Sequence, residues 1–266
     1  MSADTVAGDF LSLLAARRIE PLRAESGTHA PPYTEGTTVF AFHCAEGVLV
    51  AGDRRATAGN WIVTDRIEKI IEVDDASLLA IAGAPAIAFE MARVLQTSFE
   101  YYRRSQLQPL SLAAKVRALA RLLRENLPMT LQGVGVVMPL FAACDPKDPQ
   151  GPPRIFFYDP LGAQFQAVDF AASGSGSGTI RSILDYQSRF GVPKPSALGR
   201  VEATVLALRL LAVAAAHDSA TGGVQPGISH FATLRLLARG RIETITEAEQ
   251  RAAWERAGID KDPQFP

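Results

Sequence analysis

Residues 35–57 read EGTTVFAFHCAEGVLVAGDRRAT, and this stretch predicts the first hairpin of a folded domain. Apolar and small residues alternate from residue 37 to residue 42, a turn can form around residues 45–47, and residues 48–51 return as a second, more buried strand. Yet 36 residues precede Thr37. We therefore expect these preceding residues to be removed, so that Thr37, at the start of the hairpin, becomes an N-terminus.

The composition predicts an ordinary soluble protein. The chain has 266 residues, of which 47% are hydrophobic and 21% are charged, and its net charge is −1. This balance lacks the basic excess that nucleic-acid binding needs. Cys44 and Cys144 are too few and too widely spaced for a disulfide framework or a CxxC metal site, which suits a reducing cytosol. The apolar run FLSLLAA at residues 10–16 is shorter than a membrane span, and Asp4 and Asp9 precede it instead of basic residues. We expect a cytoplasmic protein that binds no membrane.

The chain divides into a leader, residues 1–36, and one domain, residues 37–266. The leader ends in the Gly- and Pro-rich run ESGTHAPPYTEG, which favours an extended and accessible chain. In the domain, strands are followed by two helices, more strands, two helices and closing strands, an order that favours antiparallel sheets. We expect an α+β fold, a four-layer αββα sandwich. Beyond the first hairpin, the patterns predict strands near residues 67–73, 77–81, 134–143, 154–158, 164–169, 228–237 and 241–246, and helices near 87–102, 111–127, 179–189, 197–216 and 247–257.

The chemistry of an N-terminal threonine explains the leader. A threonine hydroxyl is a weak nucleophile unless a base takes its proton, and the nearest base for an N-terminal threonine is its own α-amine, with a pKa of about 8. An internal Thr37 has no such amine. Cleavage of the bond between Gly36 and Thr37 would create it, so the leader is predicted to keep the site inactive until then.

Asp53 and Lys69 are candidates for a charge pair that supports this nucleophile. Asp53 closes the second strand, so a tight hairpin brings it near Thr37. Lys69 lies in a predicted strand, where the two-residue period places its side chain on one face with its apolar neighbours Ile67 and Ile71. The alternative is that Asp53 caps a turn with the residue after it and that Lys69 is an exposed strand lysine.

Three further motifs bear on the chemistry of the site. Gly83, between a strand and a helix, can present a backbone N–H to a developing oxyanion. The run SGSGSG at residues 173–178 lacks the GK[ST] ending of a phosphate loop, so it is interpreted as a strand-to-helix turn with Ser175 directed at the site. The letters His-Asp-Ser at residues 217–219 match a hydrolase triad, but adjacent residues rarely converge as a triad must. We reject that triad.

Five matches in the same order carry a family resemblance. They are TTVFAFHCAEGVLVAGDRRATAGN from residue 37, IEKI at 67–70, AIAGAP at 80–85, GSGSG at 174–178 and DSATGG at 218–223. Together they closely resemble the proteolytic β-subunit of the bacterial 20S proteasome. The resemblance implies an N-terminal nucleophile hydrolase fold, a propeptide at residues 1–36 removed by autocatalytic cleavage, and a threonine-type endopeptidase that needs no cofactor or metal. The implied roles are Thr37 as nucleophile, Asp53 and Lys69 as charge pair, Gly83 as oxyanion donor, and Ser175, Asp218 and Thr221 as supports of the amine; many relatives have Ser at this last position.

The resemblance also implies a substrate preference and partners. The family's substrate-binding positions are uncharged in this chain, so we expect cleavage after apolar residues; they fall on Ala56, Thr57, Ile67, Ile71, Ile81, Pro85 and Phe89. The implied assembly stacks two rings of seven β-subunits between two rings of seven α-subunits. An ATPase ring would deliver unfolded polypeptide substrates to this chamber. The alternatives are a self-compartmentalised protease of the HslV or Anbu type, a catalytically inactive scaffold subunit, and another N-terminal amidohydrolase.

Overall fold

The computed structural model describes residues 36–59, 61–148, 150–223 and 231–258. The chain divides into two units, residues 1–32 and 33–266, and all described residues belong to the second. The predicted leader therefore lies outside the described residues, except for its last residue, Gly36. The domain boundary at residues 36 and 37 remains a prediction.

Two five-stranded antiparallel sheets form the centre of the second unit. The first has the order β10-β1-β2-β11-β12, so the predicted hairpin lies inside it and not at its edge. Its strands are β1 (Thr38–Cys44), β2 (Gly47–Gly52), β10 (Phe170–Gly174), β11 (Thr233–Ala238) and β12 (Arg241–Thr244). The second has the order β5-β6-β7-β8-β9, with β5 (Ile70–Asp74), β6 (Ser77–Ala80), β7 (Leu140–Ala143), β8 (Arg154–Tyr158) and β9 (Gln164–Ala167).

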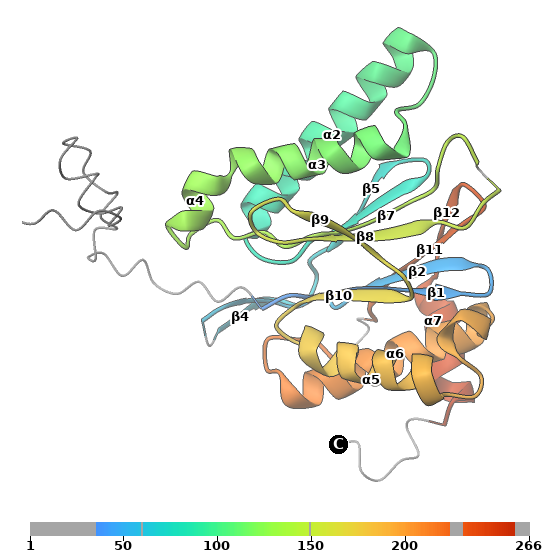
Figure 1. The fold of residues 1–266 in the computed structure, drawn as a ribbon. Helices are drawn as coiled ribbons and strands as arrows, with labels where there is room; N and C mark the ends of the chain where they lie inside the picture. The colour runs from blue at the N-terminus through green and yellow to red at the C-terminus, as the bar shows by residue number, and fades with distance from the viewer. Residues whose placement is uncertain (1–35, 60, 149, 224–230, 259–266) are drawn as a thin grey trace, which may run out of the picture. The chain divides into compact units, whose positions relative to one another are not determined.

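Helices cover the outer face of each sheet (Figure 1). The second sheet is covered by α2 (Pro85–Gln106) and α3 (Leu112–Glu125), which continue into the short α4 (Leu127–Leu131). The first sheet is covered by α5 (Ser177–Phe190), the 3₁₀ turn η1 (Pro195–Ala197), α6 (Arg200–His217) and α7 (Glu247–Arg256). Ser111 caps α3, because its Oγ accepts from the N–H of Ala114. The αββα sandwich is confirmed.

Three apolar cores hold the sandwich together. One lies between the two sheets, and each of the others lies between one sheet and its helices. In β1, Val39 and Ala41 pack between the two sheets, whereas Phe40 and Phe42 pack against the helices of the first sheet. The two-residue period of a strand produces this division, and both of its faces are buried. The hairpin is therefore fixed from both sides, and with it the position of residue 37.

The structure corrects several predicted elements. The run RRATAGN at residues 54–60, predicted as a polar connection, instead contributes to a hairpin of β3 (Ala56–Ala58) and β4 (Trp61–Thr64). Residues 170–174, of which the last two belong to the predicted turn at 173–178, form β10, an edge strand of the first sheet that pairs with β1. The predicted strand at 134–143 pairs continuously only from residue 140, and before that Val137 makes an isolated bridge with Gly83. Residues 228–230 of the predicted strand at 228–237 lie outside the described residues.

Candidate active site

The β1–β2 hairpin brings its two open ends together. Val39 pairs with Gly52, so the residues before β1 lie beside the residue after β2. The N–H of Asp53 donates to the carbonyl of Thr38 at 3.1 Å, which extends the pairing by one step. Thr37 therefore lies next to this strand end, as the sequence predicted, and the residue is only 5% exposed.

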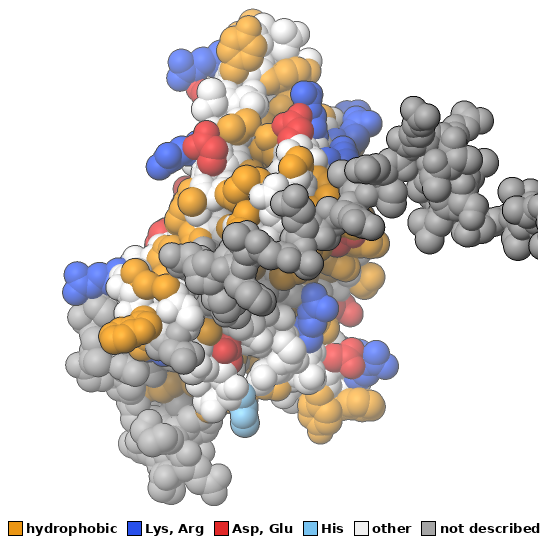
Figure 2. All heavy atoms as spheres, turned by 90° about the vertical axis from the view of Figure 1, so that its left-hand side faces the viewer, with side chains coloured by type: hydrophobic (Ala, Val, Ile, Leu, Met, Phe, Trp, Pro, Cys, Tyr) orange, Lys and Arg blue, Asp and Glu red, His pale blue; other side chains and the backbone are white. Residues whose placement is uncertain are grey.

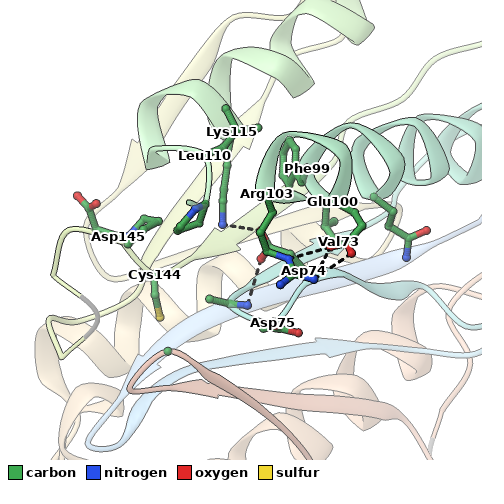
Figure 3. Close-up of a pocket in the computed structure, with 15 residues that line it drawn as sticks. Val73, Asp74, Asp75, Phe99, Glu100, Arg103, Leu110, Lys115, Cys144 and Asp145 are labelled. Atoms are coloured by element: carbon green, nitrogen blue, oxygen red, sulfur yellow. Dashed lines mark hydrogen bonds and ion pairs between the residues drawn. The ribbon is translucent and has the colours of Figure 1, made fainter. Parts of the chain in front are cut away.

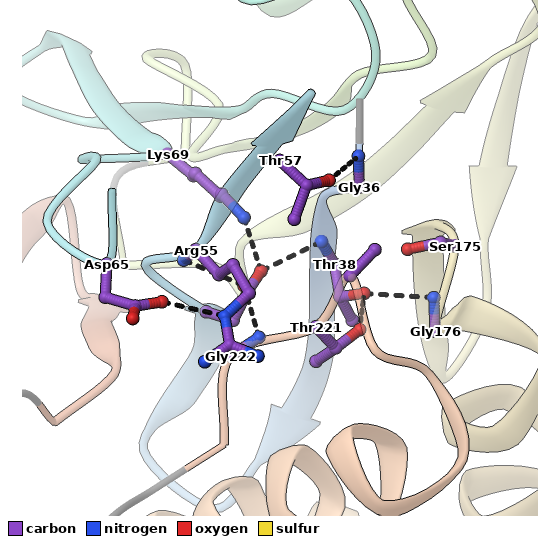
Figure 4. A network of polar contacts seen from close by, with 12 residues as sticks. Gly36, Thr38, Arg55, Thr57, Asp65, Lys69, Ser175, Gly176, Thr221 and Gly222 are labelled. Atoms are coloured by element: carbon purple, nitrogen blue, oxygen red, sulfur yellow. Dashed lines mark hydrogen bonds and ion pairs between the residues drawn. The ribbon is translucent and has the colours of Figure 1, made fainter. Parts of the chain in front are cut away.

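Asp53 is the centre of the site. Its Oδ1 accepts hydrogen bonds from the N–H of Thr38 at 2.9 Å and from the Lys69 ammonium at 2.6 Å. Its Oδ2 accepts from the N–H groups of Arg55 at 3.0 Å and Gly222 at 2.8 Å (Figure 4). Four donors satisfy a carboxylate that is almost wholly buried. The alternative interpretation was right only in that Asp53 caps a turn, because the donor is the N–H of Arg55 and not that of the next residue, Arg54, and Lys69 is buried.

Lys69 reaches Asp53 for a different reason from the one predicted. The strand β5 begins at Ile70, so Lys69 precedes it, and its Cβ lies 3.6 Å from where a side chain on Gly52 would begin. Ile71 instead packs with the helices α2 and α3. The shared-face argument was therefore wrong, since strand alternation does not extend to Lys69. The conclusion that its ammonium lies away from water was right, because the side chain is 1% exposed.

Burial dominates the electrostatics of Lys69. Desolvation of the ammonium lowers the pKa of Lys69 below its ordinary value, and the negative charge and hydrogen bond of Asp53 oppose this shift. The positive charge of Arg55 lowers the same pKa further. An ammonium with a lowered pKa gives up its proton more readily, which suits a group beside a proton-transferring nucleophile.

The peptide junction between Gly36 and Thr37 is held from several directions. The N–H of Gly36 donates to Thr57 Oγ1 at 3.1 Å, and the carbonyl of Thr37 accepts from the N–H of Ser175 at 2.9 Å. Gly174 has a φ of +94°, and a Cβ there would lie 1.6 Å from the Thr37 carbonyl oxygen. A glycine is therefore required where β10 approaches the junction.

A second hydrogen-bonded chain lies beside the junction. The hydroxyls of Ser175 and Thr221 both donate to Asp218 Oδ2, at 2.6 and 2.5 Å. Because the Thr221 proton is used in this way, the 2.6 Å contact between the hydroxyls of Thr221 and Thr38 has Thr38 as donor. The N–H of Gly176 completes the chain by donating to Thr38 Oγ1 at 3.0 Å. The three predicted supporting residues are thus brought together, and Thr221 contacts Thr38 directly.

Gly83 occupies a position that only glycine fits. Its φ is +102°, and a Cβ would lie 2.0 Å from the carbonyl oxygen of Val136. The hydrogen bonds on either side of it use the N–H of Ala84 and the carbonyl of Ala82. Among the described residues, no hydrogen bond uses the N–H of Gly83 itself, which is what its predicted role toward a substrate oxygen requires.

Several residues of the site were missed by the sequence reasoning. Thr38 supplies both a backbone and a side-chain hydrogen bond, and Arg55 ties three segments together. The Arg55 guanidinium donates to Asp65 Oδ1 at 2.8 Å and to the carbonyl of Ser219 at 3.2 Å (Figure 4). The contact of the Arg55 N–H with Asp53 had a local signal, because an aspartate often accepts from the N–H two residues after it in a turn. No local signal exists for Gly222, which is 169 residues away from Asp53.

The predicted substrate-binding residues lie in two environments. Thr57 lies at the junction itself, and Ile71, Ile81 and Phe89 pack with the core formed beside α2. The remaining three are half-buried, at Ala56 in β3, at Ile67 before β5 and at Pro85, which begins α2. All seven side chains are uncharged.

Among the described residues, no three His, Cys, Asp or Glu side chains are grouped as metal ligands would be. No helix within the same ranges is long and apolar enough to cross a membrane. The arrangement can still perform acid–base and nucleophilic chemistry, because it combines hydroxyls, a buried ammonium and a saturated carboxylate.

Two antiparallel sheets between two helix layers are the architecture of the N-terminal nucleophile hydrolases. Residues 33–225 match the proteasome subunit family, and the chain belongs to this family. It is 37% identical to "Proteasome subunit beta" of Acidimicrobium ferrooxidans over 242 residues, which cover 90% of this chain and 85% of that one. It is 40% identical to the protein of the same name from Acidothermus cellulolyticus over 218 residues, which cover 81% and 73% of the two chains. These similarities support a β-type role in a proteasome.

Proposed function

We propose that the chain is a proteolytic β-subunit and that Thr37 is its nucleophile once the Gly36–Thr37 bond has been cleaved. One observation carries this proposal: the buried pair of Lys69 and Asp53, 2.6 Å apart, is anchored to the N–H of Thr38, one residue from Thr37. A buried ammonium paired in this way costs desolvation energy, and its link through Asp53 to the residue after the proposed nucleophile gives that cost a function. Residues 1–36 then act as a propeptide and residues 37–266 as the catalytic domain.

The proposed reaction is a threonine-type peptide hydrolysis. Autocatalytic cleavage frees the α-amine of Thr37, which takes the proton of its own hydroxyl while the Lys69 ammonium stabilises the negative charge on the oxygen. The hydroxyl oxygen attacks the scissile carbonyl, and the N–H of Gly83 donates to the resulting oxyanion. The amine passes its proton to the leaving nitrogen, which leaves an ester on Thr37 that water hydrolyses. The chain from Ser175 and Thr221 to Asp218 holds the amine side of the site.

The substrate preference follows from the uncharged substrate-binding positions. Apolar side chains at residues 67, 71, 81 and 89 favour an apolar residue before the scissile bond. Fluorogenic peptides that differ only at this position measure the preference. Faster hydrolysis after an acidic or a basic residue would contradict it.

The proposed partners are α-type subunits, other β-subunits and an ATPase ring that delivers unfolded chains in the cytoplasm. Three consecutive apolar residues of β4, Trp61, Ile62 and Val63, are exposed on this isolated subunit. Hydrophobic side chains also show elsewhere on the face that carries β4 and α4 (Figure 2). Exposed apolar runs of this kind suit a subunit that partners cover in an assembly.

The test is peptidase activity of particles that form when the chain is co-expressed with an α-type subunit from the same genome. Thr37→Ala should abolish hydrolysis, whereas Thr37→Ser should retain part of it because the hydroxyl and the amine persist. Retained turnover in the Thr37→Ala particles would overturn the nucleophile assignment. Active particles that form without any α-type subunit would instead favour the self-compartmentalised alternative.

A further inference from the structure

We propose that Arg235 is a positioning residue that holds the segment around Lys69 against the first sheet, so that Lys69 stays in contact with Asp53. Arg235 lies on β11, and its guanidinium pairs with Glu68 and Glu72, which flank Lys69 in the sequence. Arg235 and these two glutamates are called the Arg235 clamp. The inference rests on the proposed function, because it names a residue that supports the catalytic role given there to Lys69.

The pair of Lys69 and Asp53 joins the two sheets. Asp53 follows β2 of the first sheet, whereas Lys69 precedes β5 of the second. The carbonyl of Lys69 accepts from the N–H of Ile81 at 2.9 Å, so the main chain of Lys69 is tied to the second sheet. The 2.6 Å between the Lys69 ammonium and Asp53 Oδ1 therefore depends on how closely the two sheets are held together at this point.

Arg235 occupies an inward-facing position of β11. Leu237 on the same strand packs between the two sheets, whereas Leu234 and Leu236 pack against the helices of the first sheet. The two-residue period of a strand places Arg235 on the same face as Leu237, between the sheets. Its side chain is only 18% exposed. Charged side chains seldom occupy such positions unless they are paired, so the partners of Arg235 indicate what it does there.

The partners of Arg235 lie on either side of Lys69. The Arg235 Nε donates to Glu72 Oε1 at 3.3 Å, and its Nη2 lies 3.9 Å from Glu68 Oε1. Glu68 is the residue before Lys69, and Glu72 is the third residue after it. Both glutamate side chains are about half exposed, so their ion pairs add little stability by themselves. Their main effect is geometric, because one guanidinium ties two points around Lys69 to the first sheet.

The strand β11 is also the neighbour of the strand that ends at Asp53. Thr233 of β11 pairs with Gly52, the residue before Asp53, and Arg235 pairs with Val50. The strands β2 and β11 are thus fixed to each other by the ladder of the first sheet. A contact from β11 to the start of β5 therefore sets the position of Lys69 relative to Asp53.

Proton exchange at the Lys69 ammonium tests the clamp without any need for peptidase activity. The chain has only five lysines, so isotope-labelled lysine gives few NMR signals, and the signal lost in Lys69→Met is that of Lys69. A buried, hydrogen-bonded ammonium exchanges its protons slowly with water at mildly acidic pH. In the unassembled full-length Arg235→Met chain, the Lys69 protons should exchange at least about tenfold faster, because Lys69 leaves Asp53 more often.

Lys115 is an internal control in the same spectra. It is as buried as Lys69 and pairs with Asp74 at 2.6 Å, but it lies on the helix side of the second sheet (Figure 3). Its protons should exchange at a rate within about twofold of the wild-type value in Arg235→Met. Equal acceleration at both lysines would overturn the proposal, because it would indicate general loosening of the fold.

Arg200→Met is the matched control variant. Arg200 also pairs with two glutamates, Glu243 at the first sheet's edge strand β12 and Glu249 on α7, but it lies on the helix side of that sheet. Its removal should leave the exchange of Lys69 and the kcat of assembled particles within about twofold. An effect as large as that of Arg235→Met would overturn the proposal.

Two ways of breaking the clamp separate its geometry from its charge. Arg235→Met removes a positive charge and E68Q/E72Q removes two negative charges, so a long-range effect of charge would have opposite signs. Both variants should instead lower kcat about tenfold with KM within about threefold, because Lys69 acts in the chemical step. Opposite effects, or an unchanged kcat in both, would overturn the proposal. Loss of the proposed function itself would appear separately, as activity of wild-type particles that does not depend on Thr37.

Discussion

Two buried lysines in this molecule pair with aspartates at the same distance, and their difference defines the site. Lys69 lies 2.6 Å from Asp53, and Lys115 lies 2.6 Å from Asp74. Both lysine side chains are at most 2% exposed. By residue type, distance and burial of the lysine, the two pairs are nearly identical.

Their surroundings differ. Asp53 is fully buried and receives backbone N–H groups from three separate chain segments beside the cleavage junction. The Asp74 side chain is 25% exposed, receives one turn N–H, from Ala76, and faces an open cavity (Figure 3). Lys115 donates to Ser77 and lies 5.8 Å from the ring centre of Phe99, so it anchors α3 to the second sheet. A buried ion pair thus serves only the fold unless it lies close to a reactive group.

Removal of each lysine should separate the two roles most strongly. Lys69→Met should lower kcat/KM about 10³- to 10⁴-fold, because the charge beside the Thr37 hydroxyl is lost. Lys115→Met should leave kcat/KM within about threefold, since Lys115 lies on the outer helix layer. Peptide hydrolysis by assembled particles of each variant measures both values. Equal losses would show that Lys69 acts only through the fold.

Stability should respond in both variants, but unequally. Lys69→Met leaves a wholly buried carboxylate without its cation, which costs about 3 kcal/mol of unfolding free energy. Lys115→Met should cost about 1 to 2 kcal/mol, because water reaches the partly exposed Asp74 and compensates it. Urea denaturation of the unassembled subunits gives the two values. A larger loss for Lys115→Met would reverse the comparison.

Glycine substitutions test the backbone of the site against a matched turn. Gly83→Ala forces a Cβ against Val136 at a φ of +102° and should cost about 2 to 3 kcal/mol, with lower activity. Gly59→Ala has a φ of +58° but meets nothing within 4 Å, so it should cost about 1 kcal/mol. Thermal melting and peptide hydrolysis of both variants are the measurements. Full activity in Gly83→Ala would remove Gly83 from the oxyanion role.

The pH dependence should show the lowered pKa of Lys69. Below its folded-state pKa, Lys69 is protonated in both folded and unfolded chains, so stability does not vary with pH through this group. Between that value and the ordinary pKa of 10.5, the unfolded chain binds more protons, and the unfolding free energy rises with pH. The activity that needs the ammonium should fall over the same window, which lies below pH 10.5.

The variant Asp53→Asn sharpens this prediction. Asp53 opposes the effect of burial on Lys69, so its neutralisation should move the alkaline fall in kcat/KM to lower pH. An alkaline limb that does not move in Asp53→Asn would show that a group other than Lys69 titrates there. Initial rates between pH 6 and pH 11 provide this test.

The strands and helices whose apolar residues recur with a regular period were predictable from the sequence. The hairpin at residues 38–52 and the helices α2, α3, α5, α6 and α7 were found because their buried faces recur every two residues or every three to four. The hairpin β3–β4 was missed because its apolar residues are exposed and its flanks are polar. Residues 170–174 were missed because the Gly/Ser run that begins at residue 173 dominates the local pattern.

Site contacts between residues close in the sequence were predictable, whereas contacts between distant segments were less so. Asp53 followed from the hairpin, whereas Lys69 was placed correctly by a strand argument that the structure contradicts. Thr38 and Gly222 were missed because their contacts join residues far apart in the sequence, and no period or spacing encodes them. The roles given to Thr37, Gly83 and Ser175 remain predictions that geometry supports.

The most direct test is the intact mass of this chain in particles purified after co-expression with an α-type subunit. The account predicts a mass that begins at Thr37, because cleavage after Gly36 both removes the leader and creates the catalytic amine. A mass that retains residues 1–36 in fully assembled particles would contradict it. Such a chain would have the fold and the charge pair without the nucleophile they are proposed to serve.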